Sequence, residues 1–354
     1  MSPKDIVAGV SQLTQTKLMP TVPKKWSPQF HFGLQAYGLK AFQSATSNAR
    51  QVVVSANTAA RKSERLLANS KLADHFGEVF DALGLIKPAS FVNIDHSDMN
   101  RLVALVGAVQ TRKGRAVPCL VETTYSDHLP AQGSARSTPR TNALRQMRAK
   151  ERRTTSFTGH YIDALQTFAE RLGFWPKLVF DRGFGNESLV THLTAEGCTF
   201  YIRLKGGRFV HLDGQRIATK ALAQTDATAE LFGLTLRIVR SPKNRRAKEP
   251  WYILTNDQNS SRDKVVRIYY HRFEIEETFR DMKHIWELKR TRLNKPNSLK
   301  VIMWLVSIGI GLLYLVAKPT KHVGCFHSKK QISWLRQAYE QLQQATNLLL
   351  WGQG

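Results

Sequence analysis

Residues 176–207, PKLVFDRGFGNESLVTHLTAEGCTFYIRLKGG, decide the fold class. PKLVFD is an apolar run typical of a buried strand, ESLVTHLTAEG has apolar residues at helical spacing, and CTFYIRLKGG is again strand-like. A strand, a helix and a strand in this order predict a parallel strand pair with a crossover helix. The segment therefore indicates an α/β domain with a mixed sheet flanked by helices.

The chain before this segment predicts three further strands. SFVNID (90–95), LVALVGAVQ (102–110) and AVPCLVETTYS (116–126) are apolar runs, and Gly114 lies between the second and the third, as in a hairpin turn. This spacing predicts an antiparallel meander.

The chain after this segment is first β-rich and then helical. RFVHLDG (208–214), ELFGLTLRIVR (230–240) and PWYILTND (250–257) indicate a β insertion rather than part of the main sheet. A long helix is expected from Ser261 to about Arg290, followed by an apolar helix and a final amphipathic helix over 331–350.

The N-terminal region, up to about Leu85, is expected to be helical and to bind DNA. SANTAARKSERLLANSK (55–71) begins with Ser55 as a candidate N-cap and predicts a basic helix with Arg61, Lys62 and Arg65. The alternative is a solvated charged face. We divide the chain into a helical DNA-binding region 1–85, a first core segment 86–205, a β insertion 206–258, a second core segment 259–320 and a C-terminal helix 321–354.

The charge of the chain points to a polyanionic partner. Lys and Arg number 52 against 27 acidic residues, a formal net charge of +25. Basic side chains that neutralise phosphates release counterions, so this imbalance favours nucleic acid over small metabolites. The segment 135–153, with Arg145 and Arg148, is expected to be a DNA-contacting arm, with a basic loop as the alternative.

Two further features bear on where the protein acts. The cysteines, Cys119, Cys198 and Cys325, are widely spaced and favour a reducing cytoplasm. The apolar run 301–317 is short for a membrane span and is expected to be a buried helix, without membrane association.

Two predicted strands end in an aspartate, Asp95 and Asp181. Parallel strands deliver the residues at their carboxyl ends to one edge of the sheet, where ligands bind in open α/β folds. Two carboxylates there repel each other unless a cation neutralises them, and carboxylate oxygens suit Mg²⁺ or Mn²⁺. Asp98 is a rival ligand, but we place it in the loop after the strand. For either aspartate alone, a turn residue is the alternative interpretation.

The predicted helix after residue 261 contains a third carboxylate among cations. Tyr269, Arg272, Glu276 and Lys283 fall within an arc of about 60° on a continuous helix. A carboxylate for a metal, flanked by cations for phosphate, is what phosphoryl transfer on DNA requires. A surface helix with ion pairs through Glu274, Glu277 and Asp281 is the alternative. The adjoining apolar stripe, expected to be buried, is Ile268, Ile275, Phe279, Met282 and Trp286.

The spacing Tyr269-x₂-Arg272-x₃-Glu276-x₆-Lys283 resembles the YREK signature of bacterial insertion-sequence DDE transposases. The resemblance covers roughly residues 90–316 and includes four further segments, FVNIDHSD (91–98), DRGFGNESL (181–189), YIRLKGG (201–207) and PWYILTN (250–256). It implies an RNase H-like core in which Asp95, Asp181 and Glu276 form the catalytic triad.

The resemblance also implies cofactors and partners. Two Mg²⁺ ions, replaceable by Mn²⁺, would serve cleavage of transposon ends and strand transfer into target DNA. The DNA partners would be terminal inverted repeats and target DNA, bound by a homodimer. Tyr269, Arg272 and Lys283 would grip the DNA.

Two more residues have open roles in this scheme. Trp251 would stack on a base turned out of the duplex, or pack in a β core. Arg182 would contact phosphate, or be structural. The rival functions are an RNase H-fold nuclease without strand transfer and a non-catalytic DNA-binding protein descended from a transposase.

Overall fold

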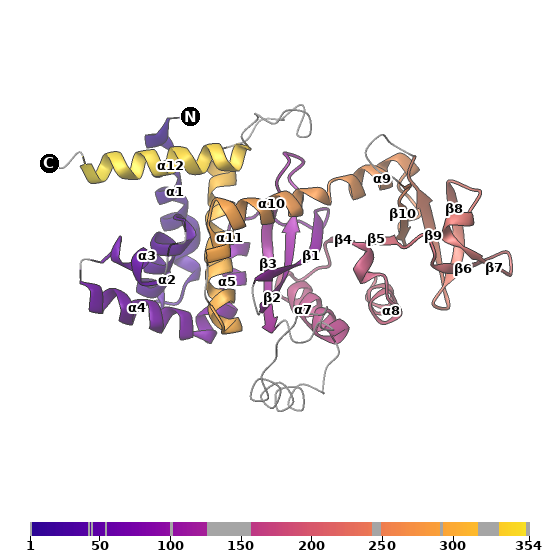
Figure 1. Cartoon of the computed structure of the whole chain (residues 1–354), viewed down its shortest axis with the longest axis horizontal. Helices are drawn as coiled ribbons and strands as arrows, with labels where there is room; N and C mark the ends of the chain where they lie inside the picture. The colour runs from indigo at the N-terminus through magenta and orange to yellow at the C-terminus, as the bar shows by residue number, and fades with distance from the viewer. Residues whose placement is uncertain are drawn as a thin grey trace, which may run out of the picture.

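The computed structural model describes residues 2–41, 43, 45–53, 55–99, 102–125, 157–242, 249–290, 293–317 and 333–351. The predicted arm with Arg145 and Arg148 lies outside these residues. The molecule is elongated, with N-terminal helices at one end and the predicted β insertion at the other (Figure 1).

One mixed sheet forms the centre of the molecule, in the order β3-β2-β1-β4-β5-β10-β9-β8-β6-β7. The expected meander is confirmed, because β2 pairs antiparallel with both β1 and β3. The expected crossover is confirmed as well: β4 and β5 are parallel, and α8 lies between them in the chain. β1 is also parallel to β4, which completes an RNase H-like sheet. The strands are β1 (Phe91–Met99), β2 (Leu102–Val109), β3 (Val117–Tyr125), β4 (Lys177–Phe180), β5 (Phe200–Leu204), β6 (Phe209–Leu212), β7 (Gln215–Ala218), β8 (Asp226–Leu231), β9 (Leu234–Arg240) and β10 (Tyr252–Thr255).

Two strand expectations were wrong. β1 does not end at Asp95 but continues to Met99, so Asp98 lies in the strand, because antiparallel pairing with β2 extends over the polar residues. The insertion is not separate from the main sheet. Its last strand, β10, pairs antiparallel with β5 and with β9, so the insertion strands extend the same sheet. All four residues of β10 are buried, as in an interior strand.

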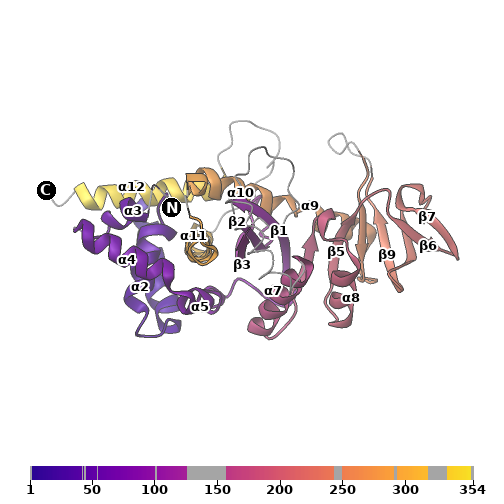
Figure 2. The ribbon, with the colours of Figure 1, turned by 60° about the horizontal axis from the view of Figure 1, so that its bottom comes forward.

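Helices cover both faces of the sheet. α7 and α8 lie on one side of the strands, and α9 and α10 lie on the other (Figure 2). The N-terminal region is helical, as predicted. The helices are α1 (Pro3–Leu13), α2 (Ser27–Gly33), α3 (Ala45–Arg50), α4 (Ala56–Ala68), α5 (Ser70–Asp81), α7 (Phe157–Leu172), α8 (Glu187–Ala195), α9 (Arg262–Tyr270), α10 (Phe273–His284), α11 (Pro296–Ala317) and α12 (Trp334–Trp351), with a short π-helical turn η3 (Leu34–Gly38) and a 3₁₀ turn η5 (Arg182–Phe184).

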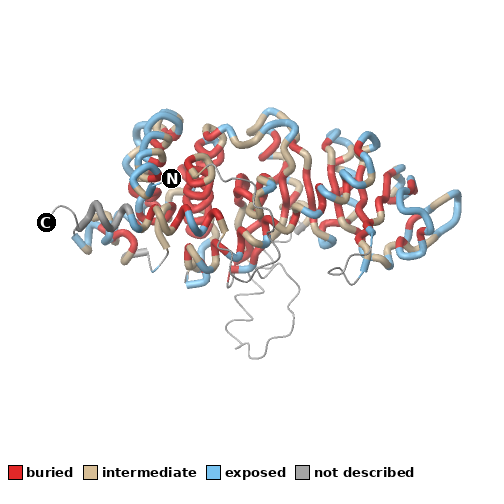
Figure 3. The backbone as a smooth tube through the Cα atoms, turned by 90° about the horizontal axis from the view of Figure 1, so that it is seen from above, coloured by how far each residue is buried: buried red, intermediate tan, exposed pale blue. Residues whose placement is uncertain are grey.

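The apolar helix α11 joins the N-terminal helices to the sheet. It contacts α5, η3 and β3, and buried residues run through this middle part of the molecule (Figure 3). In the described part of the chain it is the one helix long and apolar enough to cross a membrane, but 83% of its most apolar window is buried inside the protein. The expectation of a buried helix is therefore confirmed. Gly309 is required for this packing, because a Cβ there would lie 2.1 Å from the carbonyl oxygen of Gly38.

Candidate active site

Asp95, which lies midway along β1, is next to Asp181, which directly follows β4. The parallel register pairs Ile94 with Phe180, the residues that precede the two aspartates. Asp181 follows β4 at the N-cap position of η5, but its side chain makes no capping hydrogen bond. The role of a turn cap is therefore not supported for Asp181, whereas the strand register places this residue next to Asp95.

Arg272 connects Asp95 to Glu276. Its guanidinium nitrogen Nη1 lies 3.3 Å from Oδ2 of Asp95, and Nη2 pairs with Oε1 of Glu276. The Asp95 carboxylate also accepts a hydrogen bond from the backbone N–H of His96 at 2.8 Å. Arg272 is buried, with 5% of its surface exposed. Carboxylates from β1 and α10 thus meet at one guanidinium.

The pKa values agree with this arrangement. Burial raises the pKa of Asp95, and Arg272 partly offsets that effect. Burial by itself lowers the pKa of Arg272. The nearby Tyr269, Asp181, Glu276 and Asp95 raise it by more, so the pKa of Arg272 lies above its ordinary value. All three predicted triad carboxylates therefore act electrostatically on one buried cation, which neutralises charges that would otherwise repel each other.

The three candidate carboxylates are suitable ligands for a hard divalent cation, but in this structure Arg272 occupies the position between Asp95 and Glu276. Asp95, Asp181 and Glu276 provide the carboxylate oxygens that Mg²⁺ prefers. Among the residues that the structure describes, however, no three acidic, histidine or cysteine side chains are grouped so that they could hold a metal ion. The Arg272 guanidinium lies where it pairs with both Asp95 and Glu276.

The predicted long helix is interrupted in this site, which corrects the sequence analysis. α9 ends at Tyr270 and α10 begins at Phe273. The backbone N–H of Arg272 donates to Tyr269 rather than Ile268, and that of Ile275 donates to Arg272 rather than His271. The angles calculated for one continuous helix therefore do not apply across the break.

Two polar side chains, Asn93 in β1 and Gln110 directly after β2, bind the carbonyl groups released at the break. Nδ2 of Asn93 donates to the carbonyl oxygen of His271 at 3.0 Å, and Nε2 of Gln110 donates to that of Ile268 at 3.1 Å. Gln110 also donates to Oδ1 of Asn93 at 2.7 Å. Side chains that bind helix carbonyls in this way are a known cause of helix breaks. Sequence reasoning missed Asn93, although its position two residues before Asp95 predicts the same face of the strand.

The other predicted site residues differ in exposure. Tyr269 is buried, and its ring centroid lies 5.9 Å from the Arg272 guanidinium. Lys283 is partly buried, and burial lowers its pKa, while Asp98 and Asp95 act in the opposite direction. Arg182 is exposed. The predicted apolar stripe is buried throughout, at Ile268, Ile275, Phe279, Met282 and Trp286.

Trp251 lies in the interior. It is 6% exposed, and its ring contacts Tyr269 at 5.4 Å and Phe273 at 5.9 Å between centroids. This placement agrees with the alternative of a packed β core; stacking on a base would require the ring to become accessible.

The acidic residues given to the surface-helix alternative instead attach α10 to the hairpin between β2 and β3. Glu274 accepts hydrogen bonds from the backbone N–H groups of Thr111 and Arg112 at 2.9 and 3.2 Å. Asp281 pairs with Arg115 at 2.6 Å. The helix is therefore fixed to the sheet on one side and presents Glu276 on another.

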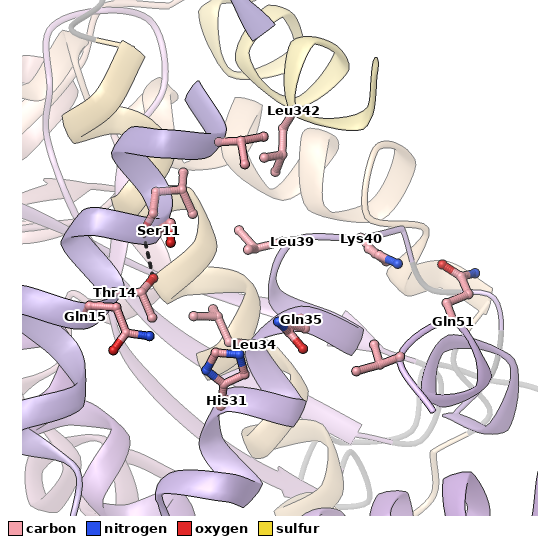
Figure 4. Close-up of a pocket in the computed structure, with 13 residues that line it drawn as sticks. Ser11, Thr14, Gln15, His31, Leu34, Gln35, Leu39, Lys40, Gln51 and Leu342 are labelled. Atoms are coloured by element: carbon pink, nitrogen blue, oxygen red, sulfur yellow. Dashed lines mark hydrogen bonds between the residues drawn. The ribbon is translucent and has the colours of Figure 1, made fainter. Parts of the chain in front are cut away.

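The N-terminal region contains exposed cations and a separate hollow. Arg61, Lys62 and Arg65 are exposed on α4, as a DNA-binding face requires, and Ser55 is the N-cap residue without a side-chain capping bond. A mainly apolar hollow of about 460 Å³ lies between α1, η3 and α12 (Figure 4). None of the three candidate carboxylates lines it, so it is not the site of the expected chemistry.

Comparison with known families gave one match, over part of the chain. Residues 153–311 match the family model described as the transposase DDE domain. The matched segment includes Asp181, Trp251 and the residues from Tyr269 to Lys283, but begins after Asp95. A search of curated proteins found no match. The match supports a transposase function in general, and the place of Asp95 rests on the geometry alone.

Proposed function

We propose, from the match to a transposase DDE domain, that this protein is a cut-and-paste DDE transposase of a bacterial insertion sequence. It cleaves the transposon ends and transfers them to target DNA. The observation that supports this most directly is the meeting of Asp95 and Glu276 at Arg272, with Asp181 next to Asp95 in the sheet. A structural ion pair needs one carboxylate for one guanidinium, whereas three carboxylates act electrostatically on Arg272.

The proposed cofactor is a pair of Mg²⁺ ions, with Mn²⁺ able to replace them. DDE transposase domains normally use a divalent metal. Once the Arg272 guanidinium moves away from Asp95 and Glu276, these two carboxylates and Asp181 would hold the metal. The metal would supply activation of water or of a DNA 3′ hydroxyl and stabilisation of the departing oxygen.

The chain's own residues have distinct parts in this scheme. Arg272 keeps the carboxylates neutralised in the absence of substrate, and the same planar group is suited to bind a DNA phosphate once it leaves them. Lys283 adds a cation on the same side of α10, and Arg182 adds one beside Asp181. Tyr269 supports Arg272 through the face of its ring.

The proposed partners are terminal inverted repeats and target DNA. The exposed cations of α4, Arg61, Lys62 and Arg65, would bind the repeats, and Arg145 and Arg148 would add contacts. We propose that the protein acts in the cytoplasm as a homodimer, with one protomer at each transposon end.

The test combines the full-length protein, a labelled duplex with the inverted repeat that flanks the gene, Mg²⁺ and a supercoiled plasmid. The proposal expects cleaved ends and labelled plasmid. Cleavage without labelled plasmid would instead identify a nuclease, and binding without cleavage a non-catalytic DNA-binding protein. Asp181→Asn should abolish both products. The matched control is Asp263→Asn, because that side chain is 79% exposed in α9 and lies outside the proposed triad.

A further inference from the structure

The outer end of the β insertion contains a hollow of about 670 Å³. It is lined by the cations Lys205, Arg208 and Arg216 and by the aromatic rings Phe209 and Phe232. Phe209 is 48% exposed, more than any other large hydrophobic side chain in the described ranges. This end of the molecule, around β6 and β7, is largely exposed (Figure 3). Phe209 therefore presents an accessible aromatic ring among cationic side chains.

The cations lie against the rings of this hollow. The Arg216 guanidinium is 4.0 Å from the ring centroid of Phe209, and that of Arg208 is 5.5 Å from the ring centroid of Phe232. The strand register explains the first contact. In the pairing of β6 with β7, His211 lies opposite Arg216. Phe209 is two residues before His211 and therefore lies on the same exposed face of β6. Glu230, which pairs with His211 across to β8, is the acidic residue of the lining.

This hollow is connected to the candidate active site. Nη2 of Arg208 donates a hydrogen bond to the carbonyl oxygen of Gly185 at 2.9 Å, and Gly185 directly follows the η5 turn that begins after Asp181. The same guanidinium therefore contacts a ring of the hollow and the loop of a proposed catalytic residue. A DNA strand bound at Asp181 would therefore have the cations of the hollow, Lys205, Arg208 and Arg216, on the side of β6.

We propose that this hollow binds unpaired nucleotides of a DNA strand that extends from the active site. One base stacks on Phe209, and the backbone phosphates contact Lys205, Arg208 and Arg216. Non-specific single-strand sites combine these features, an aromatic platform and a cationic groove along the backbone. Trp251, the aromatic residue that the sequence suggested for stacking, is buried, whereas Phe209 is accessible. The inference rests on the proposed function in naming DNA as the strand and in placing the active site at Asp181.

The test uses the full-length protein in EDTA, so that binding is measured without cleavage. The probe is an oligothymidylate that contains one 2-aminopurine, whose fluorescence falls when the base stacks. Phe209→Ala should weaken binding about tenfold, as expected for the loss of one stacked base, and should restore the fluorescence. Phe209→Trp should bind like the wild type, and Phe209→Leu should remain weak, because it keeps an apolar side chain without an aromatic face.

A second pair of variants tests the phosphate contacts. Lys205→Gln should reduce the slope of log affinity against log salt by about 0.7, the value for one phosphate contact on a single strand. Lys87→Gln, in the exposed segment before β1, removes the same charge and should leave the slope unchanged.

The outcomes separate this inference from the proposed function. The stacking proposal is overturned if Phe209→Ala binds the oligothymidylate as tightly as the wild type does. It is also overturned if the wild type prefers duplex DNA and does not quench 2-aminopurine. Either result holds even when end cleavage and joining are observed. If the protein joins no DNA but loses stacking in Phe209→Ala, the binding site is supported and the transposase proposal fails.

Discussion

Helix α10 presents carboxylates in two different environments. Glu274, 5% exposed, accepts backbone hydrogen bonds from Thr111, Arg112 and Gly114 in the hairpin between β2 and β3. The Glu276 side chain, two residues later, is 44% exposed and pairs with Arg272. One carboxylate is fully engaged by fixed donors, and the other retains accessible oxygen atoms.

The difference shows how to separate structural from functional acids in one helix. Backbone N–H groups in a turn are held by the fold, so the carboxylate that binds them has a fixed structural role. A side-chain cation can move away when a metal or a phosphate arrives. The hairpin side therefore fixes the position of α10, whereas the Glu276 carboxylate on the other side is accessible enough for a metal to reach it.

The largest expected effect is at Glu276. Glu276→Gln keeps the size of the side chain and removes its charge, so metal-dependent cleavage should fall by about a thousandfold or more, which corresponds to the several kcal/mol that a metal contributes. The urea midpoint of unfolding should stay the same, since the side chain is half-exposed. Cleavage assays and urea titrations of the same preparation measure both. Retained cleavage would remove Glu276 from the triad.

Glu274→Gln should show the opposite pattern. It replaces a charged acceptor of backbone hydrogen bonds, so the free energy of unfolding should fall by about 2 kcal/mol. The urea titration measures this loss, and cleavage per folded molecule should change much less than in Glu276→Gln. Unchanged stability would mean that the hairpin does not fix α10.

Asn93→Ala tests whether the helix break positions the site. The variant should lose about 1–2 kcal/mol of stability, because it leaves the His271 carbonyl without this donor. The Mg²⁺ concentration for half-maximal cleavage should also rise severalfold, since Arg272 and Glu276 follow the break. The control is Asn48→Ala, another buried asparagine, which donates to the carbonyl of Ala36 at 2.8 Å in the N-terminal region. It should lose stability without a change in Mg²⁺ dependence, and equal Mg²⁺ shifts would show that Asn93 is only structural.

The smallest expected effect is at Lys283. Lys283→Ala should weaken binding of end DNA by a few-fold and reduce the salt slope by about 1, the value for one phosphate contact. Arg280→Ala removes the same charge from α10, but that side chain is 62% exposed and pairs with Glu277. It should change binding less. If the two variants weaken binding equally, Lys283 contributes only to the overall positive charge and makes no specific contact with DNA.

Much of the fold could be predicted from local patterns. The meander, the β4–α8–β5 crossover, the helical N-terminal region and the buried α11 all follow from apolar periodicity and turn residues. The length of β1 could not be predicted, because pairing with β2 extends the strand over the polar residues His96, Ser97 and Asp98. The pairing of β10 with β5 could not be predicted either, because tertiary packing decides which strand β10 joins. The apolar sequence of β10 was nevertheless a signal for an interior strand, and all four of its residues are buried.

The acidic residues of the candidate site were proposed from the sequence, whereas the residues that position them were not. Asp181 and Glu276 could be chosen from a strand end and a spaced motif, and the structure brings Glu276 to Asp95 through Arg272. The helix break depends on Asn93 and Gln110, which are distant in sequence from α9, so helical spacing alone predicts a continuous helix. The exposure of Phe209 and the burial of Trp251 likewise depend on which insertion strands pair.

The pairing of β10 with β5 has a mechanical consequence. A domain joined by a flexible tether can move relative to the carboxylates, but strands in one hydrogen-bonded sheet keep a fixed offset from them. Nucleotides bound at the tip of the insertion would therefore lie at a fixed distance from the proposed cleavage site. The number of nucleotides between the two places would be set by the sheet rather than by the sequence of the DNA.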